Sequence, residues 1–371
     1  MVSKIIDRFK TKPLKSISIF SVTTIFTIGI ILLNGISLVP PEHYQKLSLN
    51  PFTTRTDISE ENYWQENILL PVVAYYLKLN SRIVFNIFCL SIFFFSCLLF
   101  TWCSYKQRPP NVALISALIL ITSPTTTIIL SWLGTPDSLT LAFTIPFLFT
   151  NSSSLFFLLT LLGTTNHIMF LIIAVEILTL RSISKKRLKI SYFLASVAGG
   201  IIGYFIVKIF ISTNNIQILV SRFDFIISKD IDLWINLNTK NFLISLFSLF
   251  NVQWVIILIS VFIFFKVDKT YYSFLILALL VNYGITFFTE DTTRVFSILS
   301  WGLLTECIFH SYEIILAQDN KADQVRYLNL LYVVVFLSLL FPRYYSWNGG
   351  IYVAPSTNEF YEWLLKSLAQ P

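Results

Sequence analysis

The stretch Ile83–Ser104 reads IVFNIFCLSIFFFSCLLFTWCS and contains no charged side chain. A helix of about 20 apolar residues is long enough to cross the hydrocarbon core of a bilayer. Comparable apolar runs recur along the chain, and a helix satisfies its own backbone hydrogen bonds in lipid. The stretch therefore predicts an all-α, polytopic transmembrane helical bundle.

The composition supports a membrane protein. Hydrophobic residues make up 55% of the 371 residues and charged residues 13%, and the mean hydropathy is +0.71. A soluble domain of this length needs more charge to cover its surface. The net charge of +7 comes from basic residues scattered among loops, so we expect no nucleic-acid partner.

We predict about eleven spans in one membrane-embedded domain over residues 1–371. The first apolar run follows the basic segment Lys4–Lys15 and lacks a small-residue cleavage site, which indicates a retained signal anchor. Three predicted spans are short enough to be half-spans or re-entrant pieces. The approximate ranges are 17–39, 83–104, 111–131, 138–150, 154–165, 167–181, 190–212, 242–265, 271–288, 295–317 and 327–342.

Lysine and arginine in the short loops predict the orientation, because they are enriched on the cytoplasmic side. They cluster in alternate loops, at Lys4–Lys15, Lys106–Arg108, Arg181–Lys189, Lys266–Lys269 and Lys321–Arg326. This places the N-terminus inside and the C-terminus outside, in a multi-pass protein of the plasma or inner membrane.

The opposite, extracytoplasmic side receives the three longest polar segments, 40–82, 213–241 and 342–371. It also receives most of the acidic residues. We expect these to form an outward-facing acidic cavity, with ordinary solvated loops as the alternative. The acidic residues are Glu42, Asp57, Glu60, Glu61, Glu66, Asp137, Asp224, Asp230, Asp232, Glu290 and Asp291.

The first outer loop contains TRTDISEENYWQENILLP at 54–71. Asp57 or Ser59 suits a helix N-cap, and Glu60 and Glu61 favour a first helical turn. The aromatic and aliphatic residues that follow, with few charges, predict a helix lying along the membrane interface. Pro71 is expected to kink that helix.

Two further segments place polar residues at outer helix ends. In LGTPDSLTLAF, Asp137 follows a tight turn and opens a helix, where it either caps the helix or points into the cavity. In GTTNHIMF, His167 lies at an outer helix junction. It has no second histidine at ligand spacing, so histidine does not support a metal site. The sequence assigns no cofactor, and a carboxylate-bound divalent cation stays open.

The segment EDTTRVFSILSWG concentrates charge between two apolar runs. Asp291 and Arg294 are three residues apart and share a face if helical. Thr292 or Thr293 is expected to cap the helix that carries Arg294. A guanidinium at a helix N-terminus favours a phosphate, and the alternative is an ion pair that anchors the helix at the interface.

This organisation resembles the GT-C superfamily of integral-membrane glycosyltransferases, which includes polyprenyl-phosphate-sugar mannosyl- and arabinosyltransferases. The shared features are the anchor helix, an acidic first outer loop with interfacial helices, many further spans and polar outer loops. LGTPDSLTLAF and EDTTRVFSILSWG are similar to the Gly-x-x-Asp and Asp-x-x-Arg stretches of bacterial members. The resemblance implies transfer of a sugar, with inversion, from a lipid-linked donor to a glycan, lipid or protein acceptor outside the cytoplasm.

The resemblance also implies residue roles. The catalytic base is Asp57 as the best match, with Glu60 or Glu61 next. The lipid phosphate is held by outer basic residues, Arg294 first and then Arg222 or Arg343. The substrate-binding residues complete the predicted site, and they are Asp137, His167, Glu290 and Asp291.

Three rival functions use the same features. A flippase or carrier for a lipid-linked or anionic substrate needs charges along a path from face to face, whereas here the charges gather outside, apart from Glu176 and Glu306 within the apolar runs. A polysaccharide polymerase also uses outer arginines and lipid phosphates. A structural subunit has no use for the long acidic loop.

Overall fold

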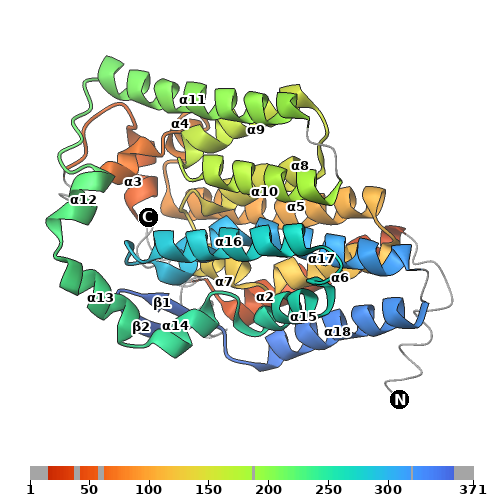
Figure 1. The fold of residues 1–371 in the computed structure, drawn as a ribbon. Coiled ribbons are helices and arrows are strands. Elements are labelled where there is room, and N and C mark those ends of the chain that lie inside the picture. The colour runs from red at the N-terminus through yellow and green to blue at the C-terminus, as the bar shows by residue number, and fades with distance from the viewer. Residues whose placement is uncertain (1–15, 37–41, 57–61, 186–188, 319–320, 355–371) are drawn as a thin grey trace.

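The structure is a computed structural model, and it describes residues 16–36, 42–56, 62–185, 189–318 and 321–354. The described chain is mostly helical, as predicted. Its long helices run side by side in Figure 1, with shorter elements gathered at one end.

Four helices are long and apolar enough to cross a membrane: α2 (Ser16–Asn34), α5 (Arg82–Gln107), α11 (Ile190–Thr213) and α18 (Lys321–Leu340). Two bent pairs raise the number to six if each pair is one span. The first joins α6 (Pro110–Ile121) and α7 (Pro124–Ser131) at 44°. The second joins α14 (Phe242–Ser248) to η2 (Asn251–Gln253) and α15 (Trp254–Phe264) at 81°. These helices suggest a multi-pass membrane protein.

Eleven spans are not shown. The helices α8 (Asp137–Phe149), α9 (Ser153–Asn166) and α10 (Phe170–Ser184) exist close to the predicted ranges but have only 13, 14 and 15 residues. At about 1.5 Å per residue they fall short of a hydrocarbon core of about 30 Å. The helices α16 (Lys269–Thr286) and α17 (Thr292–Ala317) are long enough but fail on apolar composition. Apolar runs thus predicted helices correctly, and within the described residues helix length and composition support four to six of the predicted crossings.

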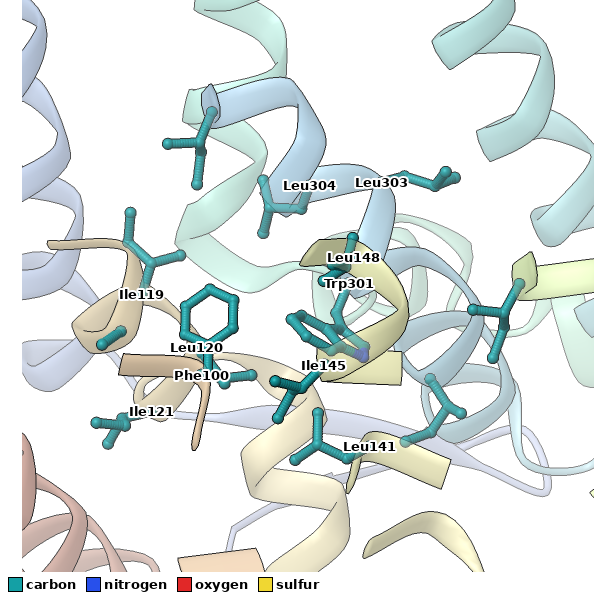
Figure 2. Close-up of a cluster of buried hydrophobic side chains, with 14 of the residues drawn as sticks. Phe100, Ile119, Leu120, Ile121, Leu141, Ile145, Leu148, Trp301, Leu303 and Leu304 are labelled. Carbon is teal, nitrogen blue, oxygen red and sulfur yellow. The ribbon is translucent and has the colours of Figure 1, made fainter. Parts of the chain in front are cut away.

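The helix α17 is the centre of the described structure. Nearly all of its residues from Phe296 to Tyr312 are buried, and it contacts α7, α8, α10, α15, α16 and α18. Figure 2 shows a layer of its core, in which Trp301 packs edge-on against Phe100 at 5.8 Å. A helix whose side chains are buried all round belongs in the interior. The other labelled members of the layer are Ile119, Leu120, Ile121, Leu141, Ile145, Leu148, Leu303 and Leu304.

Short elements occupy one end of the bundle, which we call the cavity end. They are α3 (Glu42–Leu49), η1 (Tyr63–Glu66), α4 (Leu69–Tyr76), α12 (Arg222–Ser228), α13 (Ile231–Thr239) and a β-hairpin; Figure 1 shows α3, α12, α13 and the hairpin at the left-hand end of the long helices. The helices η1 and α4 correspond to the predicted interfacial helix. The predicted kink is wrong, because Pro71 is the third residue of α4, and the first turn tolerates proline.

The hairpin corrects the all-α prediction. Strand β1 (Tyr344–Trp347) pairs antiparallel with β2 (Gly350–Val353). The connecting residues Asn348 and Gly349 both have positive φ, 49° and 67°, which a two-residue hairpin turn of this kind requires. The sequence WNGG carried this signal within the predicted outer tail.

Close packing of α11 on α9 generates the first prediction. A Cβ atom placed on Gly199 would lie 2.3 Å from the backbone oxygen of Phe157. We expect Gly199→Ala to force the two helices apart and to lower the free energy of unfolding by about 1–3 kcal/mol. Thermal unfolding of the purified protein in detergent measures this.

The matched control is Gly29→Ala in α2, where a Cβ atom meets no other atom within 4 Å. Its melting temperature should stay at or above that of the wild type, since alanine is the better helix former. Equal effects of the two substitutions would contradict the close packing of α9 and α11.

Candidate functional site

A cavity of about 320 Å³ lies at the cavity end. Its walls come from α3, η1, the turn before α8, the junction of α9 and α10, α12, the start of α17 and the hairpin. Six of the ten predicted site residues line it: Asp137, His167, Arg222, Glu290, Asp291 and Arg294. The chain thus brings together residues up to 157 positions apart.

The other four predicted residues are Arg343 and the three carboxylates of the first outer loop. Asp57, Glu60 and Glu61 lie outside the described residues. Thr54, three residues before Asp57, is described, and its Oγ1 accepts a hydrogen bond from the backbone N–H of Gln217 at 2.8 Å. Arg343 is not among the lining residues, and its Nη2 donates to the backbone oxygen of Leu33 at 3.0 Å.

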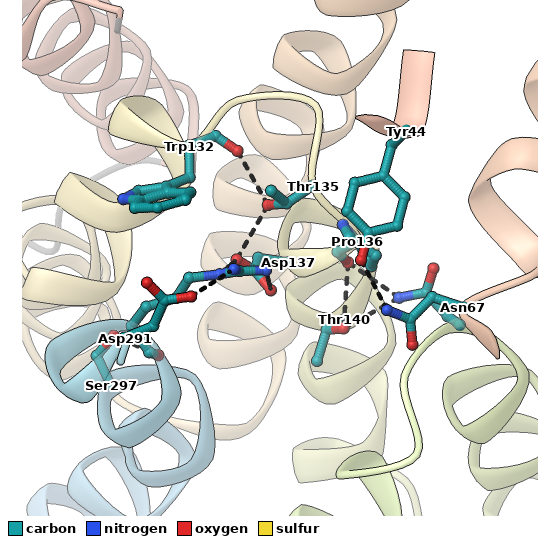
Figure 3. Close-up of polar contacts among 11 residues, drawn as sticks. Tyr44, Asn67, Trp132, Thr135, Pro136, Asp137, Thr140, Asp291 and Ser297 are labelled. Carbon is teal, nitrogen blue, oxygen red and sulfur yellow. Dashed lines mark hydrogen bonds and ion pairs between the residues drawn. The ribbon is translucent and has the colours of Figure 1, made fainter. Parts of the chain in front are cut away.

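Figure 3 shows Asp137 and Asp291 near each other, and Arg294 joins these two carboxylates. Its Nε donates to Asp137 Oδ2 at 2.6 Å, and its Nη1 donates to Asp291 Oδ2 at 3.1 Å. Thr135 Oγ1 donates to the same Asp137 oxygen at 3.0 Å, and the guanidinium carbon lies 5.4 Å from the ring centroid of Trp132. We call Asp137, Arg294 and Asp291 the charged triad.

The triad is largely shielded from water. The Asp137 side chain is 4% exposed and the Arg294 side chain 17% exposed. Burial alone would lower the pKa of the Arg294 guanidinium, but the neighbouring Asp137 and Asp291 carboxylates outweigh burial and raise that pKa above its ordinary value. With both carboxylates ionised, the triad carries one net negative charge.

The local structure at the start of α17 differs from the prediction. Neither Thr292 nor Thr293 caps the helix; Asp291 occupies the N-cap position and makes no side-chain cap bond. Thr293 Oγ1 instead accepts a hydrogen bond from the backbone N–H of Ser346 at 2.8 Å. The hydroxyl therefore ties the hairpin to α17. The predicted Asp291–Arg294 pair is present, with Asp137 as a third member.

Arg222 is the cavity's second guanidinium. It opens α12, which Ser221 and Asp224 cap in a capping box. Its guanidinium carbon lies 5.2 Å from the ring centroid of Tyr63, and within the described part of the chain it forms no ion pair. Its Nε is buried without a hydrogen-bond partner. Arg222 is therefore better placed than the paired Arg294 to hold an incoming anion.

Two more buried polar atoms of cavity-lining residues lack hydrogen-bond partners among the described residues: Trp64 Nε1, a donor, and Asp291 Oδ1, an acceptor. Buried polar groups are normally paired, and leaving one unpaired costs about 1–3 kcal/mol. Together with Arg222 Nε they form a set of two donors and one acceptor.

His167 is the C-cap residue of α9, and its Nδ1 accepts a hydrogen bond from the backbone N–H of Met169 at 3.3 Å. Burial and the positive charge of Arg222 lower the pKa of the imidazole far below its usual value, more than Asp137 raises it. At pH 7 His167 is neutral. It can exchange a hydrogen bond with a substrate but adds no charge to the cavity.

Aromatic rings form much of the cavity wall and were not predicted as site residues. Trp132 and Trp347 meet edge to face at 5.6 Å, and His43 stacks on Trp64 at 5.3 Å. Trp132 stands five residues before Asp137, so its closeness in sequence to a predicted site residue could have identified it. The hairpin, which was not predicted from the sequence, places Trp347 in the cavity wall.

Metal ligands are not gathered anywhere in the described ranges, where no group of three or more His, Cys, Asp or Glu residues is arranged to hold an ion. Glu290 instead pairs with Lys229 of the segment after α12. The chain shows no match to a protein family, to a curated protein or to a solved structure.

Replacing Arg294 by glutamine tests how much the charged triad contributes to the free energy of unfolding. Arg294→Gln leaves two buried carboxylates facing each other, and we expect it to lower the free energy of unfolding by about 3 kcal/mol. Adding Asp137→Asn should recover part of that loss, so that the double variant is more stable than the sum of the single effects implies. Chemical or thermal unfolding in detergent reports both.

Arg326→Gln is the matched control, because Arg326 pairs with Asp323 in α18 at 80% side-chain exposure. Its stability should stay within about 0.5 kcal/mol of the wild type. The buried triad would be contradicted if Arg294→Gln were as mild as this surface change.

His167 generates a pH prediction. Its pKa is lowered in the folded protein, whereas the unfolded chain binds a proton below about pH 6.5. Protonation therefore favours unfolding, and stability is lost as the pH falls below that value. Between about pH 7 and pH 5, the melting temperature of His167→Gln should fall less than that of the wild type. Identical slopes would show that the imidazole is freely protonated in the folded state.

Proposed function

We propose that the protein is a GT-C-type membrane glycosyltransferase. It transfers a sugar from a polyprenyl-phosphate donor to an acceptor hydroxyl, with inversion, at the extracytoplasmic face. The observation that carries the proposal is the cavity itself: one site at the end of an apolar bundle combines carboxylates, an arginine without a carboxylate partner and aromatic walls.

The unpaired polar atoms support a phosphate-bearing, hydroxyl-rich ligand. Arg222 Nε and Trp64 Nε1 are donors, which suit phosphate and ether oxygens. Asp291 Oδ1 is an acceptor, which suits a hydroxyl group. A sugar linked to a lipid phosphate presents both kinds of group.

The remaining walls suit the other parts of such a donor. Trp132 and Trp347 offer ring faces and edges on which a sugar can pack. On another side the lining is aliphatic and aromatic, which suits the first isoprenoid units of the lipid. These apolar lining residues are Phe225, Ile226, Ile285, Phe288, Val295, Ile298 and Leu299.

The proposed reaction divides the work among these groups. The acceptor oxygen attacks the anomeric carbon while the bond from that carbon to the phosphate oxygen breaks. A carboxylate of the first outer loop takes the hydroxyl proton, Asp57 first and Glu60 or Glu61 next. Arg222 stabilises the negative charge on the departing lipid phosphate. The charged triad holds Asp137 and Asp291 in place as hydrogen-bond partners of the sugar or acceptor.

The interior charges weigh against a carrier. Glu176 accepts a hydrogen bond from Asn282 Nδ2 at 3.1 Å, and Glu306 lies 3.9 Å from Arg181 Nε. A flippase needs polar groups that are free to meet a substrate along its path. These two carboxylates are already partnered. A polysaccharide polymerase would use the same lipid phosphate, and its long-chain product separates it from a single transfer.

Transfer of a radiolabelled sugar from polyprenyl phosphate by the purified protein in nanodiscs tests the proposal. We expect Asp57→Asn to abolish transfer and Arg222→Gln to lower kcat/KM by about 100-fold or more. Arg343→Gln is the matched control, since it removes a guanidinium outside the cavity, and its kcat/KM should stay near that of the wild type.

Two outcomes would contradict the proposal. Full activity of Asp57→Asn would reject that residue as the base and move the test to Glu60→Gln and Glu61→Gln. If no donor is consumed while fluorescent polyprenyl phosphate crosses the bilayer of proteoliposomes, the protein is a carrier. Unchanged melting temperatures of the variants ensure that lost activity does not reflect lost folding.

A further inference from the structure

The segment Arg222–Ser248 forms three consecutive short helices, α12, α13 and α14, which we call the ridge. Figure 1 shows the ridge crossing the cavity end of the bundle, from the end of α11 to the start of α15. It exposes large apolar side chains one after another: Phe223 at 70%, Ile227 at 63%, Ile231 at 67% and Leu243 at 77%. A row of this kind marks an interaction surface.

The ridge is fixed to the bundle through its other side. Trp234 is 1% exposed, and its Nε1 donates to the backbone oxygen of Ile226 at 3.2 Å. Asn238 Nδ2 donates to the backbone oxygen of Phe287 at 2.9 Å, and Lys229 pairs with Glu290. The exposed apolar side chains therefore belong to an element that is packed on the bundle.

The angle of α14 shows how the ridge lies relative to a membrane. The stretch from Asn251 to Phe264 is apolar enough to be part of a span, and α14 meets it at 81°. If that stretch enters the bilayer along the membrane normal, α14 lies nearly parallel to the membrane plane. The helices α12, α13 and α14 have only 7, 9 and 7 residues, too few to cross a bilayer themselves.

The apolar surface of the ridge continues that of its neighbours in the chain. The helix α11 exposes Phe205 and Ile209, and α15 exposes Leu258 and Phe262. α11 is a candidate span and α15 is part of a bent pair that would form one, so we expect lipid to cover these exposed apolar side chains. The ridge thus connects two lipid-facing surfaces, and the same medium is expected to cover it.

Electrostatic attraction to anionic lipids does not explain attachment of the ridge, because the ridge has as many acidic as basic residues. The basic ones are Arg222, Lys229 and Lys240, and the acidic ones are Asp224, Asp230 and Asp232. Attachment by hydrophobic burial alone needs no anionic lipid and resists salt.

We propose that the ridge inserts its apolar row into the lipid surface, at the boundary between headgroups and acyl chains. The inserted depth is about 5–10 Å, as for other interfacial helices. Because Phe225 and Ile226 of the same segment line the cavity, the ridge holds the cavity at the level of the lipid headgroups. This inference is independent of the glycosyltransferase proposal and survives if the site serves another lipid-borne substrate.

Fluorescent labels at single cysteines test the insertion. Phe223→Cys, Ile231→Cys and Leu243→Cys carry the label on the apolar row, and Asn236→Cys carries it on an exposed polar position of α13. Wild-type protein gives the labelling background, since Cys89, Cys97 and Cys307 are buried and Cys103 is half-buried. The proteins are reconstituted in phosphatidylcholine vesicles that contain lipid with a nitroxide near the headgroup.

We expect the three apolar positions to be quenched by the nitroxide lipid and protected from aqueous iodide, with the reverse at Asn236→Cys. High salt and omission of anionic lipid should leave the pattern unchanged. Quenching of the apolar positions by iodide would place the ridge in water. Protection from both quenchers, or a Leu243→Cys disulfide between two copies, would mean that protein covers it. Either result overturns the proposal.

Discussion

The buried pairing of Arg294 with Asp137 and Asp291 is the constraint on which the cavity depends. A charge removed from water is tolerated only when it is paired and hydrogen-bonded. The start of α8 and the start of α17 must therefore lie together, and Trp132 is held over the guanidinium. Because α17 is also the central helix of the bundle, the triad links the cavity wall directly to the core.

The two guanidiniums of the cavity consequently have different roles. Arg294 lies on the central helix and donates its hydrogen bonds to Asp137 and Asp291, so its role is to hold the cavity wall together. Arg222 lies on α12 of the ridge, and its guanidinium packs over the ring of Tyr63. Its buried Nε–H has no hydrogen-bond partner among the described residues. The cavity thus combines a wall of paired charges with an arginine on a peripheral element. That arrangement suits a substrate that offers both hydroxyl groups and a phosphate.

The sequence was sufficient for what depends on local pattern. The span predicted at 83–104 lies within α5, and 111–131 covers α6 and α7. The spacing of Asp291 and Arg294 predicted their pair. Hydropathy does not separate helices buried by protein from helices facing lipid, and within the described residues four to six of the eleven predicted spans have the length and composition of a crossing. Asp137 and Arg294 are 157 residues apart and no local pattern links them, while Asn348-Gly349 carried a hairpin signal that the apolar background obscured.

The layer of side chains beneath the cavity decides how a substrate can reach it. Trp301 lies seven residues beyond Arg294 on α17, which is about two turns or 10 Å. There Phe100, Leu141 and Ile145 close around it, all fully buried (Figure 2). Dense apolar packing leaves no room for a charged group to pass. A lipid-borne substrate therefore has to enter and leave at the cavity end, and a ridge seated among the headgroups would put the mouth of the cavity where such a substrate resides. This geometry favours chemistry at one face of the membrane over transport across it.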